Sequence, residues 1–336
     1  MDTMRSYVAI HYNRSKDTAA ITDGCEDYAY EDYATGQADV VNLTMDDSDR
    51  KWIGAWFPRS GDYLKCWIKT KAWESGKTNG SLFCGKFYID ECNPSGQPSR
   101  VTLSAIAVPK RSEFSKTERN RTWKKTTVKQ ILGDIAKRAG MKLVFDTGDH
   151  KISEESQSGQ TDLEFAFSLC DSFDICLKVF NNKLVAYDQT RYEKKKAVRT
   201  IRYSDILGDY SGHAAVSKVY DGVKMQYAVG KKEAARTYEF KVPGMKGTRK
   251  MYVSDKADSL SQAEHKAKAA LRKALREDFT MSFEVEGDVR YKAASTVQLK
   301  GFGKMDGKYF IDSVTHKKSR GAYTCSLTLH KVVTKF

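Results

Sequence analysis

The chain has 336 residues, of which 40% are hydrophobic and 11% aromatic, and it contains only 5 prolines. This composition excludes an intrinsically disordered chain, because enough apolar surface is present to offset the entropy lost when two or three domains fold. The formal net charge of +14 shows a basic bias. No stretch approaches the roughly 18 apolar residues of a membrane-spanning helix, and the N-terminus lacks the apolar run of a secretion signal. We therefore expect a protein that is made in the cytoplasm and does not insert into a membrane.

Residues 1–110 are predicted to form a β domain. Short apolar or alternating runs lie between turn-forming residues, which is typical of strands. The predicted strands are residues 7–12, 40–43, 63–69, 87–89 and 101–107.

The charge is distributed unevenly along the chain. Residues 23–50 contain nine acidic residues and one basic residue, whereas residues 110–129 contain eight basic residues and two acidic ones. Such asymmetry indicates either nucleic-acid binding or acidic and basic surfaces that meet between subunits. Because no nucleic-acid-binding module is recognisable, we favour complementary subunit or partner surfaces.

Residues 111–195 are predicted to form a small α+β domain. Apolar residues at helical spacing precede Gly140, which suits the end of a helix. A strand at 141–145, a second helix at 161–173 and a hairpin at 175–188, turned by Asn181 and Asn182, are expected to follow.

Residues 196–336 are predicted to form a second β domain, in which the segment 219–229 is the expected counterpart of the first strand. It contains one long amphipathic helix, 261–277, with Ser261 and Glu264 at the spacing of a reciprocal N-terminal cap. Alanine and leucine occupy one face and basic residues the other. The basic face is either solvated or meets an acidic neighbour, for which 23–50 is a candidate. The possible interface residues are Lys266, Arg272, Lys273 and Arg276.

One pattern occurs in both predicted β domains: Gly-Lys, two aromatic residues, Ile-Asp, a polar stretch and an alternating run. The interval from Ile89 to Val101 equals that from Ile311 to Tyr323, at 12 residues. We therefore predict an internal repeat of related β units. The residues that define it are Gly85, Phe87, Ile89 and Asp90 in the first unit, and Gly307, Tyr309, Ile311 and Asp312 in the second.

Each alternating run has an apolar face and a face with hydroxyl groups, because successive side chains of a strand point to opposite sides. The residues on the hydroxyl faces are Thr102, Ser104, Thr324, Ser326 and Thr328.

Motifs for catalysis are weak. Asp146-Thr147-Gly148 matches the carboxylate motif of aspartic proteases, but that chemistry needs two such carboxylates and no second copy exists. Asp90 and Asp312 are equivalent in the repeat, and we expect them to cap strand ends through backbone hydrogen bonds. The seven cysteines form no Cys-x-x-Cys pair and suit reduced, mostly buried thiols. We therefore predict no catalytic residue, no cofactor and no metal site.

Three segments together resemble the baseplate hub proteins of contractile phage tails. They are "WFPRSGDYLKCWIK" with "GKFYIDECNPSGQPSRVTLSAIA", "TWKKTTVKQILGDIAKRAGMKLVF" and "FTMSFEVEGDVRYKAASTVQLKGFGKMDGKYFIDSVTHKKSRGAYTCSLTLHKV". The family includes the late control protein D group and is similar to the front portion of VgrG spikes. The resemblance spans nearly the whole chain, although its motifs are hydrophobic patterns and glycines without a chemical signature.

The resemblance implies a mainly β, α+β chain with two related β-barrel domains. It also implies a homotrimer that forms a pseudo-sixfold ring and adapts a sixfold tail tube to a threefold spike. The expected partners are further copies of the chain, a tail tube protein, a central spike protein and baseplate wedge proteins. Nucleic acid would at most pass through the lumen.

The expected location is the baseplate of a virion or of a phage-tail-like particle such as a bacteriocin, assembled in the bacterial cytoplasm. The hydroxyl faces would line the lumen or lie on an outer, solvated surface. The alternative function is a tail-associated hydrolase that acts on cell wall or peptide.

Overall fold

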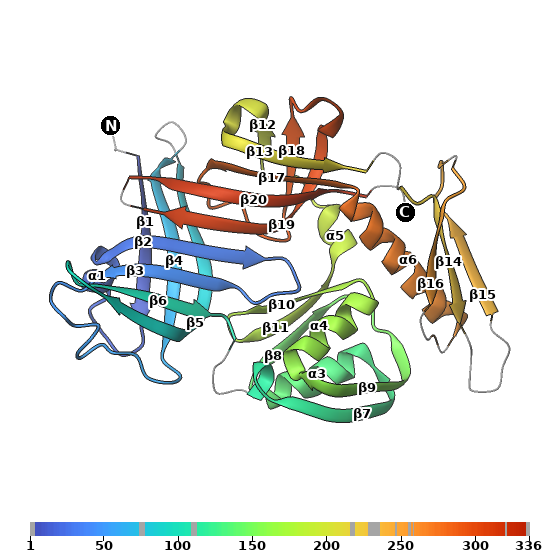
Figure 1. Cartoon of the computed structure of the whole chain (residues 1–336), viewed down its shortest axis with the longest axis horizontal. Helices are drawn as coiled ribbons and strands as arrows, with labels where there is room; N and C mark the ends of the chain where they lie inside the picture. Colours follow the sequence, from blue (N-terminus) through green and yellow to red (C-terminus); the bar gives the residue numbers. More distant parts are fainter. Residues whose placement is uncertain are drawn as a thin grey trace.

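The computed structural model describes residues 4–73, 78–108, 113–215, 219–227, 236–245, 247–254, 257, 259–319 and 321–333. Within this part of the chain a 12-stranded sheet dominates, accompanied by two three-stranded sheets and a two-stranded ribbon (Figure 1). The mainly β fold that the sequence predicts is confirmed.

The first half of the large sheet comes from the N-terminal third of the chain. Its strands follow the order β1-β4-β5-β6-β3-β2, and each pairs antiparallel with its neighbour. Figure 1 shows β1 and β4 running across the direction of β2, β3 and β6, so this half of the sheet is strongly bent. The elements are β1 Arg5–Tyr12, α1 Thr18–Asp23, β2 Cys25–Tyr33, β3 Val40–Asp46, β4 Tyr63–Ala72, β5 Thr78–Ser95 and β6 Arg100–Ile106.

The second half continues the same sheet in the order β19-β20-β17-β13, with β18 beside β19 and β12 beside β18. The elements are β12 Thr200–Arg202, the 3-10 turn η2 Tyr203–Asp205, β13 Ile206–Ala214, β17 Phe279–Glu286, β18 Thr296–Lys300, the 3-10 turn η3 Gly303–Met305, β19 Gly307–Lys318 and β20 Tyr323–Lys331.

The sequence predicts two β barrels, and the described strands differ from this arrangement. They form one open sheet whose path ends at β1 and β13, because each of these strands pairs with a single described neighbour. Apolar residues of both halves, including Leu43, Leu103, Leu299 and Leu327, belong to one hydrophobic core.

A small α+β region lies between the two halves in sequence, and its helices and hairpin agree with the predictions. Asn181 and Asn182 adopt φ values of 46° and 62°, as a tight two-residue turn requires. The ribbon β7–β9 was not predicted. The elements are η1 Glu113–Ser115, β7 Glu118–Thr127, α3 Val128–Arg138, β8 Lys142–Asp146, β9 Lys151–Thr161, α4 Asp162–Ser172, β10 Ile175–Phe180, β11 Lys183–Asp188 and α5 Gln189–Glu193.

A further small sheet is inserted between β13 and β17. Its strands are β14 Gly222–Tyr227, β15 Arg236–Lys241 and β16 Lys250–Ser254, and the helix α6 Leu260–Glu277 packs on it through a third apolar cluster. The expected equivalence of the segment 219–229 with the first strand is therefore wrong, because β1 belongs to the large sheet and β14 to this one.

The N-terminal cap of α6 also differs from the prediction. Ser259 accepts the hydrogen bond from the Gln262 N–H, so the cap lies two residues before Ser261. The domain boundaries at 110/111 and 195/196 remain predictions, and the first of them falls on residues 109–112, outside the described residues. Within the described chain, none of the helices combines the length and apolar character needed to cross a membrane.

Candidate functional site: the repeated units and their junction

The repeat seen in the sequence has a backbone counterpart. Gly85 and Gly307 both adopt the positive φ values that favour glycine, at 133° and 147°. In both β5 and β19 the pairing register shifts directly after the shared isoleucine, so that Asp90 and Asp312 each form a β-bulge. The buried aromatic and isoleucine positions also correspond, at Phe87 and Tyr309 and at Ile89 and Ile311.

The bulges correct one expectation. Asp90 and Asp312 lie within long strands, not at strand ends, since β5 continues to Ser95 and β19 to Lys318. A bulge accommodates the extra residue and bends the strand without ending it.

Five strands of each unit share one topology. The order β4-β5-β6-β3-β2 in the first unit corresponds to β18-β19-β20-β17-β13 in the second, and the chain visits the strands in the same sequence. Every pairing within both sets is antiparallel. The second unit differs by the insertion of β14 to α6 between its first two strands.

The equal interval read from the sequence does not match the pairing. Ile89 pairs with Ala105, whereas Ile311 pairs with Leu329, so the second hairpin is two residues longer. By pairing, Thr102 corresponds to Ser326 and Ser104 to Thr328. A shift of two residues keeps every side chain on its face of the sheet. The alternation of apolar and polar residues is therefore the same in both hairpins and does not reveal the difference in length.

The two units are joined by antiparallel pairing of β2 with β19 (Figure 1). Ser104, Asn42, Ala29, Lys317 and Thr324 are successive partners across β6, β3, β2, β19 and β20. Directly paired residues have side chains on the same side of a sheet. The hydroxyl faces of both units therefore form one continuous polar face.

All five predicted hydroxyl-bearing residues lie on this polar face. Thr102 and Thr328 are exposed, and Ser104, Thr324 and Ser326 are half-buried. A shallow groove of about 460 Å³ crosses the junction of the units on this face, with Thr102 at one side and Lys317 and Thr324 at the other.

On the opposite, buried side of the junction His316 stacks on Tyr30, with ring centroids 5.9 Å apart. The Tyr291 carbonyl lies 3.0 Å from Nε2 and the Tyr323 hydroxyl 2.9 Å from Nδ1. Burial lowers the pKa of His316 to about 4, so the ring is neutral at pH 7.

A buried lysine ties the middle region to the junction. The Lys178 ammonium donates to Asp32 at 2.5 Å, Asp39 at 2.7 Å and the Tyr33 carbonyl at 2.7 Å. Burial alone would lower the pKa of Lys178, but the two carboxylates raise it above its usual value. Lys178 on β10 therefore fixes the end of β2 where that strand pairs with β19.

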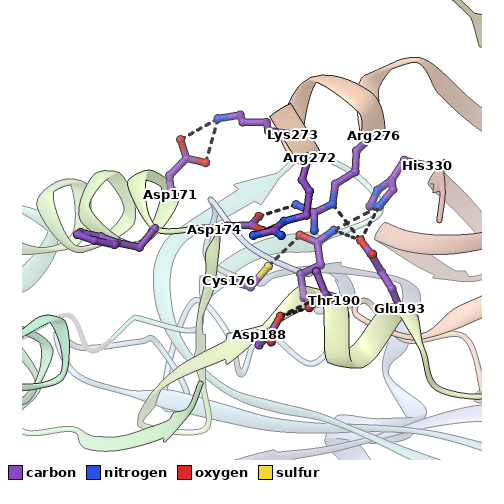
Figure 2. A network of polar contacts seen from close by, with 12 residues as sticks. Asp171, Asp174, Cys176, Asp188, Thr190, Glu193, Arg272, Lys273, Arg276 and His330 are labelled. Atoms are coloured by element: carbon purple, nitrogen blue, oxygen red, sulfur yellow. Dashed lines mark hydrogen bonds and ion pairs between the residues drawn. The ribbon is translucent and has the colours of Figure 1, made fainter. Parts of the chain in front are cut away.

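The basic face of α6 meets acidic residues of the same chain, as Figure 2 shows. Arg272 and Arg276 donate to Asp174 at 2.7 and 2.6 Å, and Lys273 donates to Asp171. Of the two alternatives for this face, the acidic neighbour is the one found, and it is the end of α4 with the turn after it, not the candidate segment 23–50. Lys266 lies over the ring of Phe173.

Arg276 also belongs to a buried polar cluster. It donates to Glu193 at 2.9 Å, and His330 lies 3.3 Å from the same carboxylate and 2.7 Å from Asp312. Burial alone would lower the pKa of His330, but Asp312 and Glu193 raise it. An adjacent pocket of about 420 Å³ is lined by Arg276, Asp312 and His330 among others. Arg276 is paired with Asp174 and Glu193, and His330 with Asp312 and Glu193.

The remaining chemical candidates carry structural contacts. Asp146 ends β8 and accepts from Arg191 at 2.8 Å. All seven cysteines are free thiols, five of them buried, and burial raises the pKa of Cys25 and Cys176 to about 12. Among the described residues, no group of three or more His, Cys, Asp or Glu is placed to hold a metal ion.

One family model matches part of the chain. The family model described as YQBQ-like matches residues 204–330, which cover most of the second unit and its insertion. A search of curated proteins gives no match.

Solved structures cover nearly the whole chain. The 43 kDa tail protein of prophage MuSo2 from Shewanella oneidensis superposes with a TM-score of 0.69 at 12% identity, over 98% of this chain and 99% of that one. The tail protein from Neisseria meningitidis MC58 gives 0.70 at 14% identity, over 97% and 96%.

The E. coli c3393 protein gives 0.60 at 10% identity, over 97% of this chain and 78% of its own. That protein is described as a type VI secretion component with structural similarity to the phage T4 tail proteins gp27 and gp5. The resemblance derived from the sequence is thus confirmed at the level of the fold, and the chain has the fold of these phage tail proteins.

Proposed function

We propose that the chain is a structural hub of a tail baseplate, in which three copies form a ring that adapts a sixfold tube to a threefold spike. The observation that carries the proposal is the shared five-strand topology of the two units, with the same glycine and bulge in each. Three chains with two similar units each supply six similar surfaces to a tube. The partners in this proposal are the tail tube, the spike and the wedge proteins of the particle.

The continuous polar face is proposed to line the lumen. Its hydroxyl groups hydrogen-bond readily to water and present few apolar contacts that would retain a passing molecule. The proposal assigns no catalytic role, since Arg276, Asp312 and His330 beside the 420 Å³ pocket are engaged in ion pairs.

Light scattering of the purified chain, alone and with its tube and spike partners, tests the ring. We expect a three-chain species, and electron-microscopic averages with six similar inner densities. A hub that enters the particle as a monomer or dimer would overturn the proposal.

The lumen assignment has its own test. Ser326→Cys in the assembled ring is expected to react with a small maleimide but not with one attached to a large polymer. Lys124→Cys on β7, whose side chain is 71% exposed, is the control that should react with both. Equal reaction of Ser326→Cys with both reagents would place the polar face outside.

A further inference from the structure

The strand β13 at the end of the large sheet differs in burial from its equivalent, β2. Pairing to β17 and β3 makes Tyr210 the counterpart of Tyr28 and Gly212 the counterpart of Tyr30. Tyr28 is 2% exposed beside β19, whereas Tyr210 is 49% exposed. Tyr210 pairs with the buried Phe283 and therefore points to the core side of the sheet. Its exposure results from the edge position of β13.

The first unit has an open edge at the end of β5, at the positions equivalent to those where β19 pairs with β2. In β19, residues 313–318 pair with β2, and the positions equivalent to 313–317 in β5 are 91–95, directly after the bulge. Among the described strands β4 reaches only Tyr88, so residues 91–95 pair with β6 alone. Glu91, Asn93, Pro94 and Ser95 are exposed.

We propose that β13 of one chain pairs antiparallel with residues 91–95 of β5 in a second copy, repeating between chains the junction that β2 and β19 form within each chain. This joint deepens the proposed hub function and rests on it, because it names the surfaces by which the three chains close. The surface partner is a second copy of this chain.

The equivalences set the register. Since Glu31 pairs with Thr315 in the internal junction, His213 pairs with Asn93 of the second copy, and Ala214 with Cys92. The same register sets Gly212 against Pro94 and Tyr210 against Gly96.

Main-chain N–H and carbonyl groups of β13 point to its open edge, where a strand of a second copy could pair with them. The Ala34 N–H donates to the Asp312 carbonyl, so alternate residues of β2 from Ala34 onward face β19. The Ala215 N–H donates to Asp278, which turns the N–H and carbonyl groups of Ala214 and Gly212 to the open edge. These are the positions equivalent to Asp32 and Tyr30, which face β19.

The side chains are compatible in this register. No like charges lie opposite each other, and Glu91 lies diagonal to His213, where residues of neighbouring strands can interact. The ring of Tyr210 faces Gly96, beside which no atom lies within 4 Å of an added Cβ.

Pro94 occupies the position of His316 and has no N–H, so the joint between chains has one main-chain donor fewer than the internal junction. We expect the joint between chains to be the weaker and to separate when the ring is diluted.

Disulfide trapping in the full-length chain tests the register. The variant Asn93→Cys with His213→Cys, in a chain whose half-buried Cys25 and Cys92 are serine, places thiols at a directly opposed pair on the polar face. Opposed residues in antiparallel strands have Cα atoms roughly 4.5–5.5 Å apart, within the range of a disulfide. On oxidation most of the protein should move to three times the 38.0 kDa chain mass on a non-reducing gel.

Two variants serve as controls. Glu31→Cys with Thr315→Cys is the equivalent pair inside the chain, and it should lose its thiols without a change in mass. Asn93→Cys with Gly212→Cys places the thiols on opposite faces and should give no covalent trimer.

The outcomes separate the two proposals. A three-chain species by light scattering, without the interchain disulfide while the internal control oxidises, overturns the joint and leaves the hub function intact. Neither a three-chain species nor an interchain disulfide overturns both.

Discussion

His316 and Tyr30 stack across the junction of the two units, with ring planes 13° apart. The neutral imidazole is buried between the Tyr291 carbonyl and the Tyr323 hydroxyl. A proton on this ring would be desolvated in the middle of the contact that joins the repeated units.

Acid is therefore expected to weaken the protein through His316. The unfolded chain takes up the proton near pH 6.5 and the folded chain only near pH 4. The free energy of unfolding then falls as the pH decreases below about 6.5, and this loss levels off below about pH 4, at about 3 kcal/mol for the one group. Urea unfolding of the wild type and of His316→Gln at pH 7, 5.5 and 4 measures this loss of unfolding free energy.

The variant should be less stable at pH 7 but should show a smaller decrease on acidification. His150→Gln is the comparison variant. Burial lowers the pKa of His150 to about 4 as well, so this residue makes its own contribution, of the same sign, to the fall in unfolding free energy at low pH. An unchanged pH dependence in His316→Gln would contradict the assignment.

Replacing Lys178 should be strongly destabilising. Lys178→Met leaves the buried carboxylates of Asp32 and Asp39 without their cation, and breaking a buried ion pair in this way costs about 3–5 kcal/mol. Urea unfolding measures the loss. Combining Lys178→Met with Asp32→Asn and Asp39→Asn should recover part of the stability, whereas a further loss in the triple variant would contradict the ion-pair explanation.

The two basic residues Arg276 and Lys273 on α6 should differ in importance. Arg276→Met removes the guanidinium that Asp174 and Glu193 share in a buried site and leaves them only Arg272 and His330 as charged partners, so it should cost more than about 1 kcal/mol and up to about 3–5 kcal/mol. Lys273→Met removes an exposed pair with Asp171 and should cost less than about 1 kcal/mol. Equal unfolding free energies for the two variants would show that α6 does not depend on the buried cluster.

Glycine is required at the equivalent positions 85 and 307. Gly85→Ala and Gly307→Ala each force a side chain into a positive-φ conformation, at a cost of about 1–3 kcal/mol. Gly148→Ala is the matched control, because its backbone has no positive φ and an added Cβ would meet nothing within 4 Å. Thermal unfolding of the three variants should separate the first two from the third.

Local patterns predicted the elements that depend on local chemistry. The spacing of apolar residues identified α3, α4 and most of α6, and Asn181 with Asn182 identified the turn between β10 and β11. The repeated Gly-Lys-aromatic-aromatic-Ile-Asp pattern identified β5 and β19 as equivalent, since the glycine and the bulge serve the same bend in both strands.

Other features depend on contacts that are distant in sequence. The strand β2 was missed because it lies in the acidic segment 23–50, where Asp27, Glu31 and Asp32 flank the alternating Tyr28 and Tyr30. Asp174, Glu193 and His330 lie in separate segments and meet only in the folded chain, so no local motif indicated the partners of Arg276. The length of the second hairpin was hidden because a shift of two residues preserves the alternation of faces.

The contact between α6 and the end of α4 links two segments of the chain that have no counterpart in the repeat. Each of these segments occurs once per chain, so a ring of three chains would carry six similar units around its channel but only three contacts between α6 and α4. The periphery would then present three equivalent docking positions, while the inner surface keeps nearly sixfold spacing. One polypeptide could in this way display two different rotational orders at two different radii.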